Sequence, residues 1–494
     1  MAASAPVYLF GPGIDLGLIA GGLTFALFPL CFLIPSGWSV TAFLVLNVVC
    51  NYPHYMATNY RIYGSRSQIE RYEVLSIHVT GLLLATALLA HVLTSGWIRV
   101  LYTVYLTWSP YHYSGQNYGI ALMYLRRSGV EVTPRAKRLL YLATLASFLS
   151  YFVFINMRST GTIDAAMLQL GIPAALGRGL YVVLLAAALV CGGWVVVALA
   201  RRAPLRLLVP AVLLLATQLT WFSVLSGVGI FAPLLGVRQL RFESLLPAMA
   251  FLHCAQYLGI TAYYAKREGS AEGRSFRLAP YFAALVLGGI FLWLGTTRLL
   301  AEVFAVDYNH SFLVMAAIIN IHHFIMDGAI WKLRDGRIAR LLIAPDARAA
   351  APAPMAGVRL GQGWKVAGWG LAAVLAVALA TTDVAARIFL GQARGLADGN
   401  HFADARPLFD RVLGLNRRTV AALDGAALAS MHAGDMKSAE TLWRQSIALA
   451  PRSAHSRGGL GETYLLTGRI DDAIRELEGS LAVDPDHLTT LSLL

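Results

Sequence analysis

The chain has 494 residues, of which 57% are hydrophobic and only 14% are charged, and its mean hydropathy is +0.60. A soluble domain carries about 25% charged residues, so these values exclude a chain that is soluble throughout. The formal net charge of +13 does not indicate nucleic-acid binding, because the basic residues form short clusters between apolar runs, as in membrane proteins.

Apolar runs of membrane-spanning length recur along the chain and favour an all-α fold, a polytopic helical membrane bundle. We expect about eleven spans of about 20 residues each, at residues 14–34, 38–58, 74–95, 98–124, 137–157, 178–200, 205–226, 243–265, 279–299, 311–331 and 364–389. Basic residues are concentrated in the loops after the even-numbered spans, for example Arg126, Arg127 and Lys137 after the fourth. This alternation predicts a plasma (inner) membrane protein with a cytoplasmic N-terminus.

The predicted division of the chain follows these runs. Residues 1–345 form a catalytic or cofactor-binding membrane bundle, 346–363 a basic cytoplasmic linker, 364–389 the last span, and 390–494 a soluble helical-repeat domain. With an odd number of spans, the soluble domain lies on the outer, periplasmic side.

The soluble domain repeats at a fixed interval. Ala405, Ala439 and Ala473 are each 34 residues apart. A 34-residue helix–turn–helix repeat with an alanine in its second helix resembles the tetratricopeptide repeat. The resemblance covers about 390–487 and implies a protein or peptide partner bound along a concave face.

Six histidines lie inside the predicted spans at a comparable depth. They are His54, His78, His112, His253, His322 and His323. Counted from the nearest basic residue at the cytoplasmic end, each lies roughly 10 to 21 Å along its helix, between the cytoplasmic boundary and the middle of the membrane. Ionisable groups at this depth are costly and are kept mainly for function, so the layer predicts a metal site. His78 has the least polar company.

The stretch 318–332 contributes two adjacent histidines and a carboxylate. His323 and Asp327 are four residues apart, so they share one helical face. We expect Asp327 to be a ligand or to support one. Imidazoles with a carboxylate suit iron, manganese or zinc.

Polar side chains at helical spacing accompany the histidines. A ligating imidazole usually donates its second N–H to an oxygen acceptor, and side-chain amides three or four positions away are expected to provide it. These amides are Asn51, Gln116, Gln256 and Asn320. Thr58 and Tyr257 follow His54 and His253 at the same helical spacing.

A histidine layer with a carboxylate at the cytoplasmic side resembles the histidine-rich membrane non-haem iron enzymes. These include the fatty-acid desaturases and hydroxylases and the Brp/Blh-type carotene-cleaving oxygenases. The resemblance covers about 45–335 and implies iron that activates dioxygen against a membrane lipid or another apolar, isoprenoid-like substrate entering from the bilayer. The chain lacks the HxxxH and HxxHH boxes of the desaturases, so one metal is as compatible as two. The implied ligands are His54, His112, His253, His322, His323 and Asp327.

Two other classes stay open on the sequence alone. Histidines on different spans also serve as axial ligands in haem-binding membrane electron-transfer proteins. A multi-span glycosyltransferase or transporter with a repeat domain is the second class. A transferase would be expected to place acidic groups on the outer face, near Glu302, Asp307 or Glu243.

Overall fold

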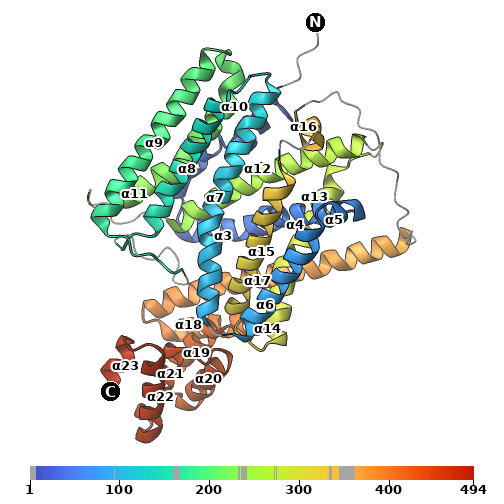
Figure 1. Ribbon diagram of the computed structural model, residues 1–494. Coiled ribbons are helices and arrows are strands. Elements are labelled where there is room, and N and C mark those ends of the chain that lie inside the picture. The colour runs from blue at the N-terminus through green and yellow to red at the C-terminus, as the bar shows by residue number, and fades with distance from the viewer. Residues whose placement is uncertain are drawn as a thin grey trace. The chain divides into compact units, whose positions relative to one another are not determined.

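Helices dominate the computed structural model of the chain (Figure 1), which describes residues 7–93, 95–158, 167–231, 234, 242–271, 273, 275–332, 336–343 and 362–494. Within these residues a single isolated β-bridge joins Met157 to Ile172, and the regular elements are all helical. The prediction of an all-α fold is therefore confirmed. The predicted linker at 346–363 lies outside the described residues, apart from its last two positions.

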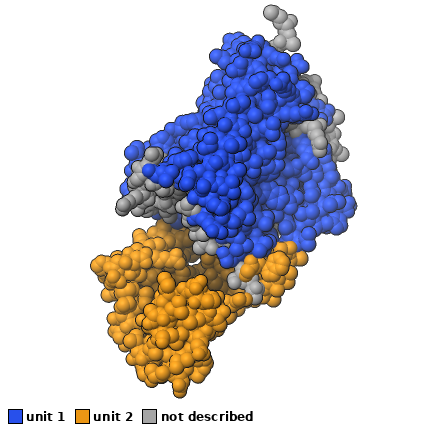
Figure 2. Space-filling view, turned by 60° about the vertical axis from the view of Figure 1, so that its left-hand side comes forward, with its two compact units in different colours: residues 1–84, 99–289, 317–361 blue, residues 85–98, 290–316, 362–494 orange. Residues whose placement is uncertain are grey.

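Contacts divide the chain into two compact units, which Figure 2 colours separately. Unit 1 consists of Met1–Leu84, Arg99–Gly289 and Ala317–Gly361, and unit 2 of Ala85–Ile98, Ile290–Ala316 and Gln362–Leu494. Unit 2 thus combines the C-terminal repeats with two earlier segments of the chain.

Unit 1 holds most of the helices before residue 345. They are α1 (Pro12–Ile14), η1 (Asp15–Ile19), α2 (Thr24–Leu33), α3 (Ser36–Leu46), η2 (Asn47–Asn51), α4 (Tyr52–Tyr63), α5 (Arg66–Arg71), η3 (Val74–Val79), α7 (Ser95–Arg127), α8 (Pro134–Ile155), α9 (Ala174–Ala200), α10 (Leu205–Gln218), η5 (Leu219–Val224), α11 (Leu225–Phe231), α12 (Phe242–Ala271), α13 (Leu278–Ile290), α15 (Tyr308–Ile330) and α16 (Gly336–Leu342). The first residues of α7 and of α15 and the last residue of α13 belong to unit 2. The elements marked η are π-helical turns.

Eight helices of the described residues are long and apolar enough to cross a membrane, and a bent pair, Pro12–Ile19 with Thr24–Cys31, raises the number to nine. Two further predicted spans, 38–58 and 98–124, are helical but are not among these. Both contain polar residues that lower their hydropathy, including those of the candidate site. The total of eleven spans therefore stays a prediction.

The helix that carries His54 changes its winding just before this residue. The π-helical turn η2 precedes Pro53, which lies in the first turn of α4. Proline has no N–H to donate to the preceding turn, and a π-turn is one way in which a helix accommodates such a misfit. Because the extra residue rotates the following side chains about the helix axis, it contributes to the direction in which His54 points.

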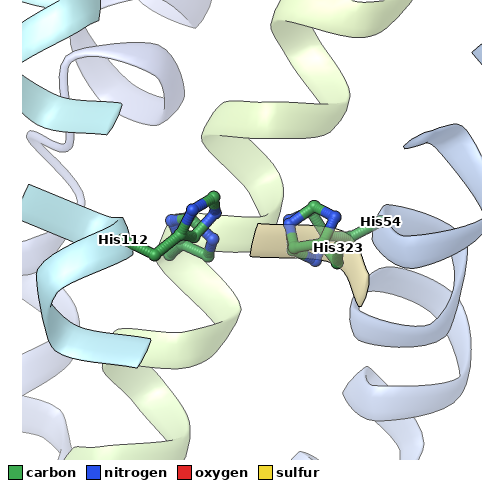
Figure 3. A group of neighbouring side chains, drawn as sticks. His54, His112 and His323 are labelled. Atoms are coloured by element: carbon green, nitrogen blue, oxygen red, sulfur yellow. The ribbon is translucent and has the colours of Figure 1, made fainter. Parts of the chain in front are cut away.

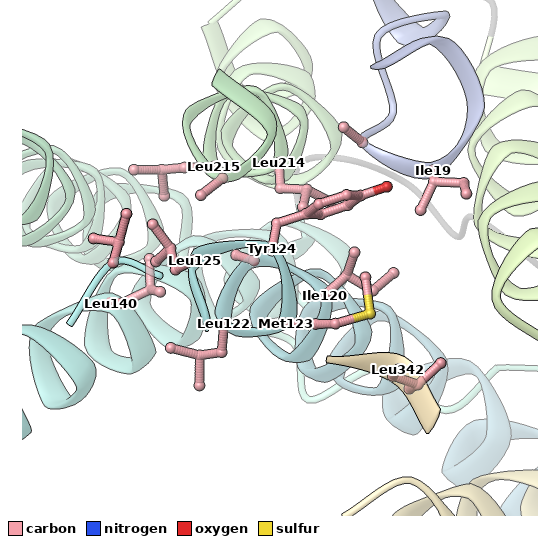
Figure 4. Close-up of a cluster of buried hydrophobic side chains, with 14 of the residues drawn as sticks. Ile19, Ile120, Leu122, Met123, Tyr124, Leu125, Leu140, Leu214, Leu215 and Leu342 are labelled. Carbon is pink, nitrogen blue, oxygen red and sulfur yellow. The ribbon is translucent and has the colours of Figure 1, made fainter. Parts of the chain in front are cut away.

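A buried apolar cluster joins α7, α8 and α10 in unit 1. Tyr124 is fully buried in it, close to Leu125 and Leu214 (Figure 4). The Tyr124 hydroxyl donates to Oδ1 of Asp15 at 2.7 Å, and the same carboxylate accepts hydrogen bonds from the backbone amides of residues 9–11. A buried carboxylate needs such partners. Asp15 therefore fixes the chain ahead of the first helix.

The repeat region is built directly on the last helix of membrane-spanning length. The helices of unit 2 are most of α6 (Thr80–Val92), whose residues 80–84 belong to unit 1, and η7 (Phe291–Gly295), α14 (Thr296–Val303), α17 (Gln362–Asp398), α18 (Phe402–Leu415), α19 (Val420–His432), α20 (Met436–Leu449), α21 (Ala454–Leu466), α22 (Ile470–Val483) and α23 (Leu488–Leu493). Ala393 of α17 is fully buried with Ala405 and Phe409 of α18. The end of α17 therefore acts as the first helix of the array, and the predicted boundary at 390 falls inside a continuous helix.

Candidate metal centre

Four histidines from four different helices of unit 1 converge on one point. They are His54 of α4, His112 of α7, His253 of α12 and His323 of α15, and one ring nitrogen from each lies within 4.8 Å of one from each of the others. Figure 3 shows the rings of His54, His112 and His323 directed into the same space. An ion binds imidazole nitrogens at about 2.1 Å, so two ligands of one ion lie at most roughly 4.2 Å apart. Closing this group on an ion requires movements of less than about 1 Å.

The four imidazole rings form a continuous packed group. Their centroids are 4.2 Å apart for His54 and His323, 4.9 Å for His112 and His323, 5.0 Å for His54 and His253, and 5.2 Å for His112 and His253. All four pairs meet edge to face. The space between the rings therefore suits a single small ion better than a planar macrocycle.

The ring nitrogens at this point lack hydrogen-bond partners among the described residues. Both nitrogens of His54 and of His253 are buried and unpaired, as are Nε2 of His112 and Nε2 of His323. A buried polar atom without a partner costs about 1–3 kcal/mol. A metal ion shared by the four rings would bind one nitrogen of each, and would therefore provide a partner for four of these six atoms.

A carboxylate lies beside the imidazoles. Oδ2 of Asp327 is 3.4 Å from Nε2 of His323 and 3.9 Å from Nε2 of His112. Its other oxygen, Oδ1, accepts hydrogen bonds from the hydroxyls of Thr58 at 2.9 Å and Tyr257 at 2.7 Å. These two hydroxyls hold the carboxylate in place while Oδ2 faces His112 and His323. Asp327 lies beside the four-histidine group but is not one of the residues whose candidate ligand atoms all lie within 4.8 Å of one another.

Thr58 also fixes the proton on His323. Its hydroxyl donates to Asp327, so its oxygen is left to accept the N–H of Nδ1 of His323, 2.8 Å away. With the proton on Nδ1, the lone pair of His323 is on Nε2, the nitrogen that faces the other imidazoles. A histidine ligand is commonly oriented in this way by an oxygen acceptor on its second nitrogen.

Two of the six predicted histidines do not join the group. Nε2 of His322 lies 3.1 Å from the Thr80 hydroxyl and 3.3 Å from that of Tyr63. Successive residues point about 100° apart around a helix, so His322 and His323 cannot face the same point. His78 is exposed on the η3 turn. The structure therefore does not bring His78 and His322 together with the other four predicted histidines.

The four predicted amides lie one layer farther out. The Gln116 side chain donates to the carbonyl oxygen of His253 at 3.1 Å and to Oε1 of Gln256 at 3.0 Å. Asn51 accepts a hydrogen bond from the Cys254 thiol. Asn320 accepts one from the Tyr55 hydroxyl at 2.6 Å.

These bonds connect helices with one another and position the histidine-bearing backbone. The ring acceptor is instead Thr58, which sequence reasoning noted at helical spacing from His54 but gave no role. Tyr257 likewise had no assigned role, although it holds the carboxylate of Asp327.

A cavity of about 600 Å³ in unit 1 reaches the candidate centre. His112 and Asp327 form part of its wall, and aromatic residues such as Trp108, Tyr118 and Phe324 form much of the rest. Pockets of this size bind small organic molecules. The cavity therefore reaches the candidate centre at His112 and Asp327.

In unit 2, the loop between α14 and α15 binds the first repeat. The amide of Tyr308 donates to the carbonyl oxygen of Arg418 at 2.8 Å, and Oδ1 of Asp307 accepts the amide of Val420 at 3.0 Å. Glu302 forms an ion pair with Arg418 at 2.9 Å. Asp307 and Glu302, two of the three acidic residues considered for a transferase, therefore form structural contacts. The side chain of the third, Glu243, lies outside the described part of the chain.

Unit 2 also contains a cavity of about 650 Å³ between α17 and the first repeats. Asp383, Arg387 and Asp424 are among the residues that line it. Burial raises the pKa of Asp424 above its usual range, although Ser456 donates a hydrogen bond to its carboxylate. Acidic and basic side chains thus share the wall of this cavity.

Comparison with known proteins identifies the repeats. The family described as tetratricopeptide repeat matches residues 430–492, which run from the end of α19 into α23. Repeats of this family mediate protein–protein interaction, which supports a protein partner. A search of the curated proteins found no match for the chain. The resemblance of the histidine layer to membrane iron oxygenases therefore has no support from a relative.

Proposed function

We propose that the chain is an integral membrane, metal-dependent oxidoreductase whose metal is held by His54, His112, His253 and His323, with Asp327 as the fifth ligand. The observation that carries this proposal is the convergence of buried, unpaired ring nitrogens from four helices. No protein donor among the described residues satisfies them, and one ion would satisfy one nitrogen from each ring.

The donor set favours non-haem iron. Nitrogen and carboxylate ligands also bind manganese and zinc, so these ions are the alternatives. Iron held here would supply activation of dioxygen for oxidation of a C–H or C=C bond. Haem is disfavoured because edge-to-face imidazoles with centroids as close as 4.2 Å leave no slot for a macrocycle. Thr58 would orient the His323 ring, and Thr58 and Tyr257 together would hold the carboxylate of Asp327.

The substrate proposed is a lipid or isoprenoid-like molecule. The support is the aromatic cavity beside His112 and the apolar surface of the helices. In the window of α17 that is apolar enough to cross a membrane, only 11% of the residues are buried. Such a surface is stable in lipid and is costly in water. The basic loops favour an inner-membrane protein with a cytoplasmic N-terminus and a histidine site in the cytoplasmic half of the membrane.

The repeats are proposed to bind a protein or peptide partner on the outer, periplasmic side. Support comes from the tetratricopeptide match at 430–492 and from the cavity between α17 and the first repeats. Because α17 continues into the array, a partner bound there would be held at a fixed distance from the membrane surface. A flexible linker would not impose this restriction.

The deciding experiment is the metal content of the purified full-length protein, measured by mass spectrometry. We expect about one ion per chain in the wild type and loss of most of it in His54→Ala and His253→Ala. His322→Ala is the matched control, because this residue is next to His323 but lies outside the group. It should retain the metal.

Thermal unfolding distinguishes lost binding from lost folding. An ion that binds only the folded state stabilises it, by about 2.7 kcal/mol at a concentration of 100 times Kd. A chelator should therefore lower the Tm of the wild type and of His322→Ala, and leave that of His54→Ala unchanged. A wild type without stoichiometric metal, or equal metal in folded His54→Ala and His253→Ala, would contradict the proposal.

A further inference from the structure

Helix α7 turns one face toward the cavity in unit 1. The residues of this face that line the cavity include Trp108, His112, Gly115, Gly119 and Met123. They are three or four positions apart, which is the spacing of residues on one side of a helix. Two of these positions carry no side chain, and the first of the two lies one turn from His112. The helix thus leaves space beside the candidate centre, where side chains would otherwise project.

A third glycine lies in the part of the wall that α15 contributes. Phe324, Gly328 and the following Trp331 line the cavity at the same helical spacing, and Gly328 comes directly after Asp327 in the chain. The candidate centre therefore has a glycine next to its histidine on one helix and a glycine next to its carboxylate on another.

None of the three glycines is needed for close packing. Leaving aside the backbone of its own helix, a Cβ added at Gly115, Gly119 or Gly328 would meet no heavy atom within 4 Å. A glycine that permits close approach of two helices looks different, because a Cβ on Gly289 would lie 2.5 Å from the carbonyl oxygen of Tyr52. All three cavity glycines lie inside helices, so a turn does not require them either.

Open space around a helical glycine is not by itself evidence of a site. Gly179 and Gly193 of α9 are exposed, and a Cβ added to either would also meet nothing within 4 Å. These two glycines do not line the cavity. The three cavity glycines differ from them because they share one wall with His112 and Asp327.

We infer that Gly115, Gly119 and Gly328 determine which ligands fit beside the candidate centre. They leave room for a bulky apolar group, whereas side chains at these positions would admit only a slender one. The aromatic and aliphatic side chains in the wall make an apolar group the suitable occupant of this space. The inference rests on the proposed function for the reaction that would take place there, but binding itself needs no metal.

Replacement of each glycine by leucine tests the inference, because the new side chain would project into the cavity. The variants should fold, since an added Cβ meets no neighbour and leucine favours a helix more than glycine does. The test variants are Gly115→Leu, Gly119→Leu and Gly328→Leu. The matched control is Gly193→Leu, which adds the same side chain at an exposed helical position outside the cavity.

Binding is measured by photolabelling of the full-length protein in phosphatidylcholine nanodiscs. One probe, adamantane diazirine, is compact and bulky, and the other, a hexadecane with a terminal diazirine, is slender. Mass spectrometry of peptides locates the label, at probe concentrations below saturation. Labelling of the wall residues Leu145 and Phe324 is expressed relative to that of α17, whose surface is largely exposed.

We expect both probes to label the wall in the wild type. Forcing a group into filled space costs enough free energy to weaken binding several-fold. Each test variant should therefore reduce labelling of the wall by the bulky probe about fivefold or more, and labelling by the slender probe about twofold or less. Gly193→Leu should be labelled as the wild type is.

Four results would overturn the inference. They are a wild type whose wall neither probe labels, wild-type labelling in all three test variants, an equal loss of both probes, and an equal loss in Gly193→Leu. The metal content of the same samples separates the two proposals. A labelled wild type without metal contradicts only the proposed function, and a metal-containing wild type with an unlabelled wall contradicts only the role of the glycines.

Discussion

The hydroxyl of Thr58 lies 2.8 Å from Nδ1 of His323 and thereby fixes which nitrogen of this histidine is free to bind a metal. Replacing Thr58 by valine keeps the shape of the side chain and removes the hydroxyl. Both His323 and Asp327 then lose a partner. Loss of such a partner typically lowers metal affinity about 10- to 100-fold. We expect Thr58→Val to bind the metal about 10- to 100-fold more weakly than the wild type does. Competition with a chelator of known affinity measures this difference.

Thr80→Val is the matched control for this substitution. The Thr80 hydroxyl contacts Nε2 of His322, the histidine that lies outside the group. Removal of this hydroxyl should leave metal affinity unchanged. If Thr80→Val weakened metal binding as much as Thr58→Val, the effect would come from general loosening of the bundle, and the orienting role of Thr58 would be wrong.

The four histidines of the group are among the six that the sequence predicted, but the sequence did not distinguish the directions in which the six side chains point. All four members of the group were among the six predicted histidines, because the distance to a basic loop residue follows directly from helical rise. His322 and His323 have nearly the same depth and differ by about 100° in direction. Which direction faces a neighbour depends on how helices pack, and a periodic pattern in one span does not contain this information.

The role of Thr58 could not be predicted from the sequence either, because it also depends on how the helices pack. This residue and His323 are 265 positions apart, and their contact exists only because α4 and α15 lie side by side. The four predicted amides lie on the helices that carry the histidines. Their hydrogen bonds, however, are made with backbone and side-chain groups of other helices and not with the imidazole rings. The repeats, in contrast, are local units whose 34-residue period is visible in the sequence, and for this reason they could be predicted in outline and are matched by a known family.

The glycine at the turn between α21 and α22 is expected to be necessary for the repeat. Gly468 has a φ of 75°, which an L side chain adopts at a cost of roughly 1–2 kcal/mol. Gly468→Ala should lower the protection of backbone amides in α21 and α22 by that free energy in hydrogen exchange. Gly414→Ala, on the exposed side of α18 with open space around an added Cβ, should instead be neutral or slightly stabilising.

The side of the membrane that carries the repeats can be read from cysteine labelling. The four native cysteines are buried or partly buried, so they should contribute little background. Asp471→Cys places a thiol on exposed α22, and Arg202→Cys places one in the basic loop before α10. In intact spheroplasts a membrane-impermeant maleimide should label the first and not the second. After permeabilisation both should react. Labelling of Arg202→Cys alone would reverse the predicted topology.

The contact between Asp307 and Val420 gives a prediction for pH dependence. Burial raises the pKa of Asp307, although the Val420 amide donates to its Oδ1 at 3.0 Å. The folded chain therefore keeps this proton to a higher pH than the unfolded chain does. The stability contributed by the carboxyl is full below its ordinary pKa of about 3.9, and it is lost as the pH rises through the raised value.

Asp307→Asn keeps an oxygen acceptor for Val420 and cannot ionise. We therefore expect its Tm to be similar to that of the wild type at low pH and higher than it near pH 7, because the cost of the buried charge is absent. Asp307→Ala removes the acceptor and should be destabilised by about 1–3 kcal/mol at every pH. Glu302→Gln provides a comparison, since the ion pair of Glu302 with Arg418 is partly exposed and should contribute about 1 kcal/mol or less. Equal Tm values of Asp307→Asn and wild type across this pH range would show that the carboxyl has no raised pKa, and the account of this junction would be wrong.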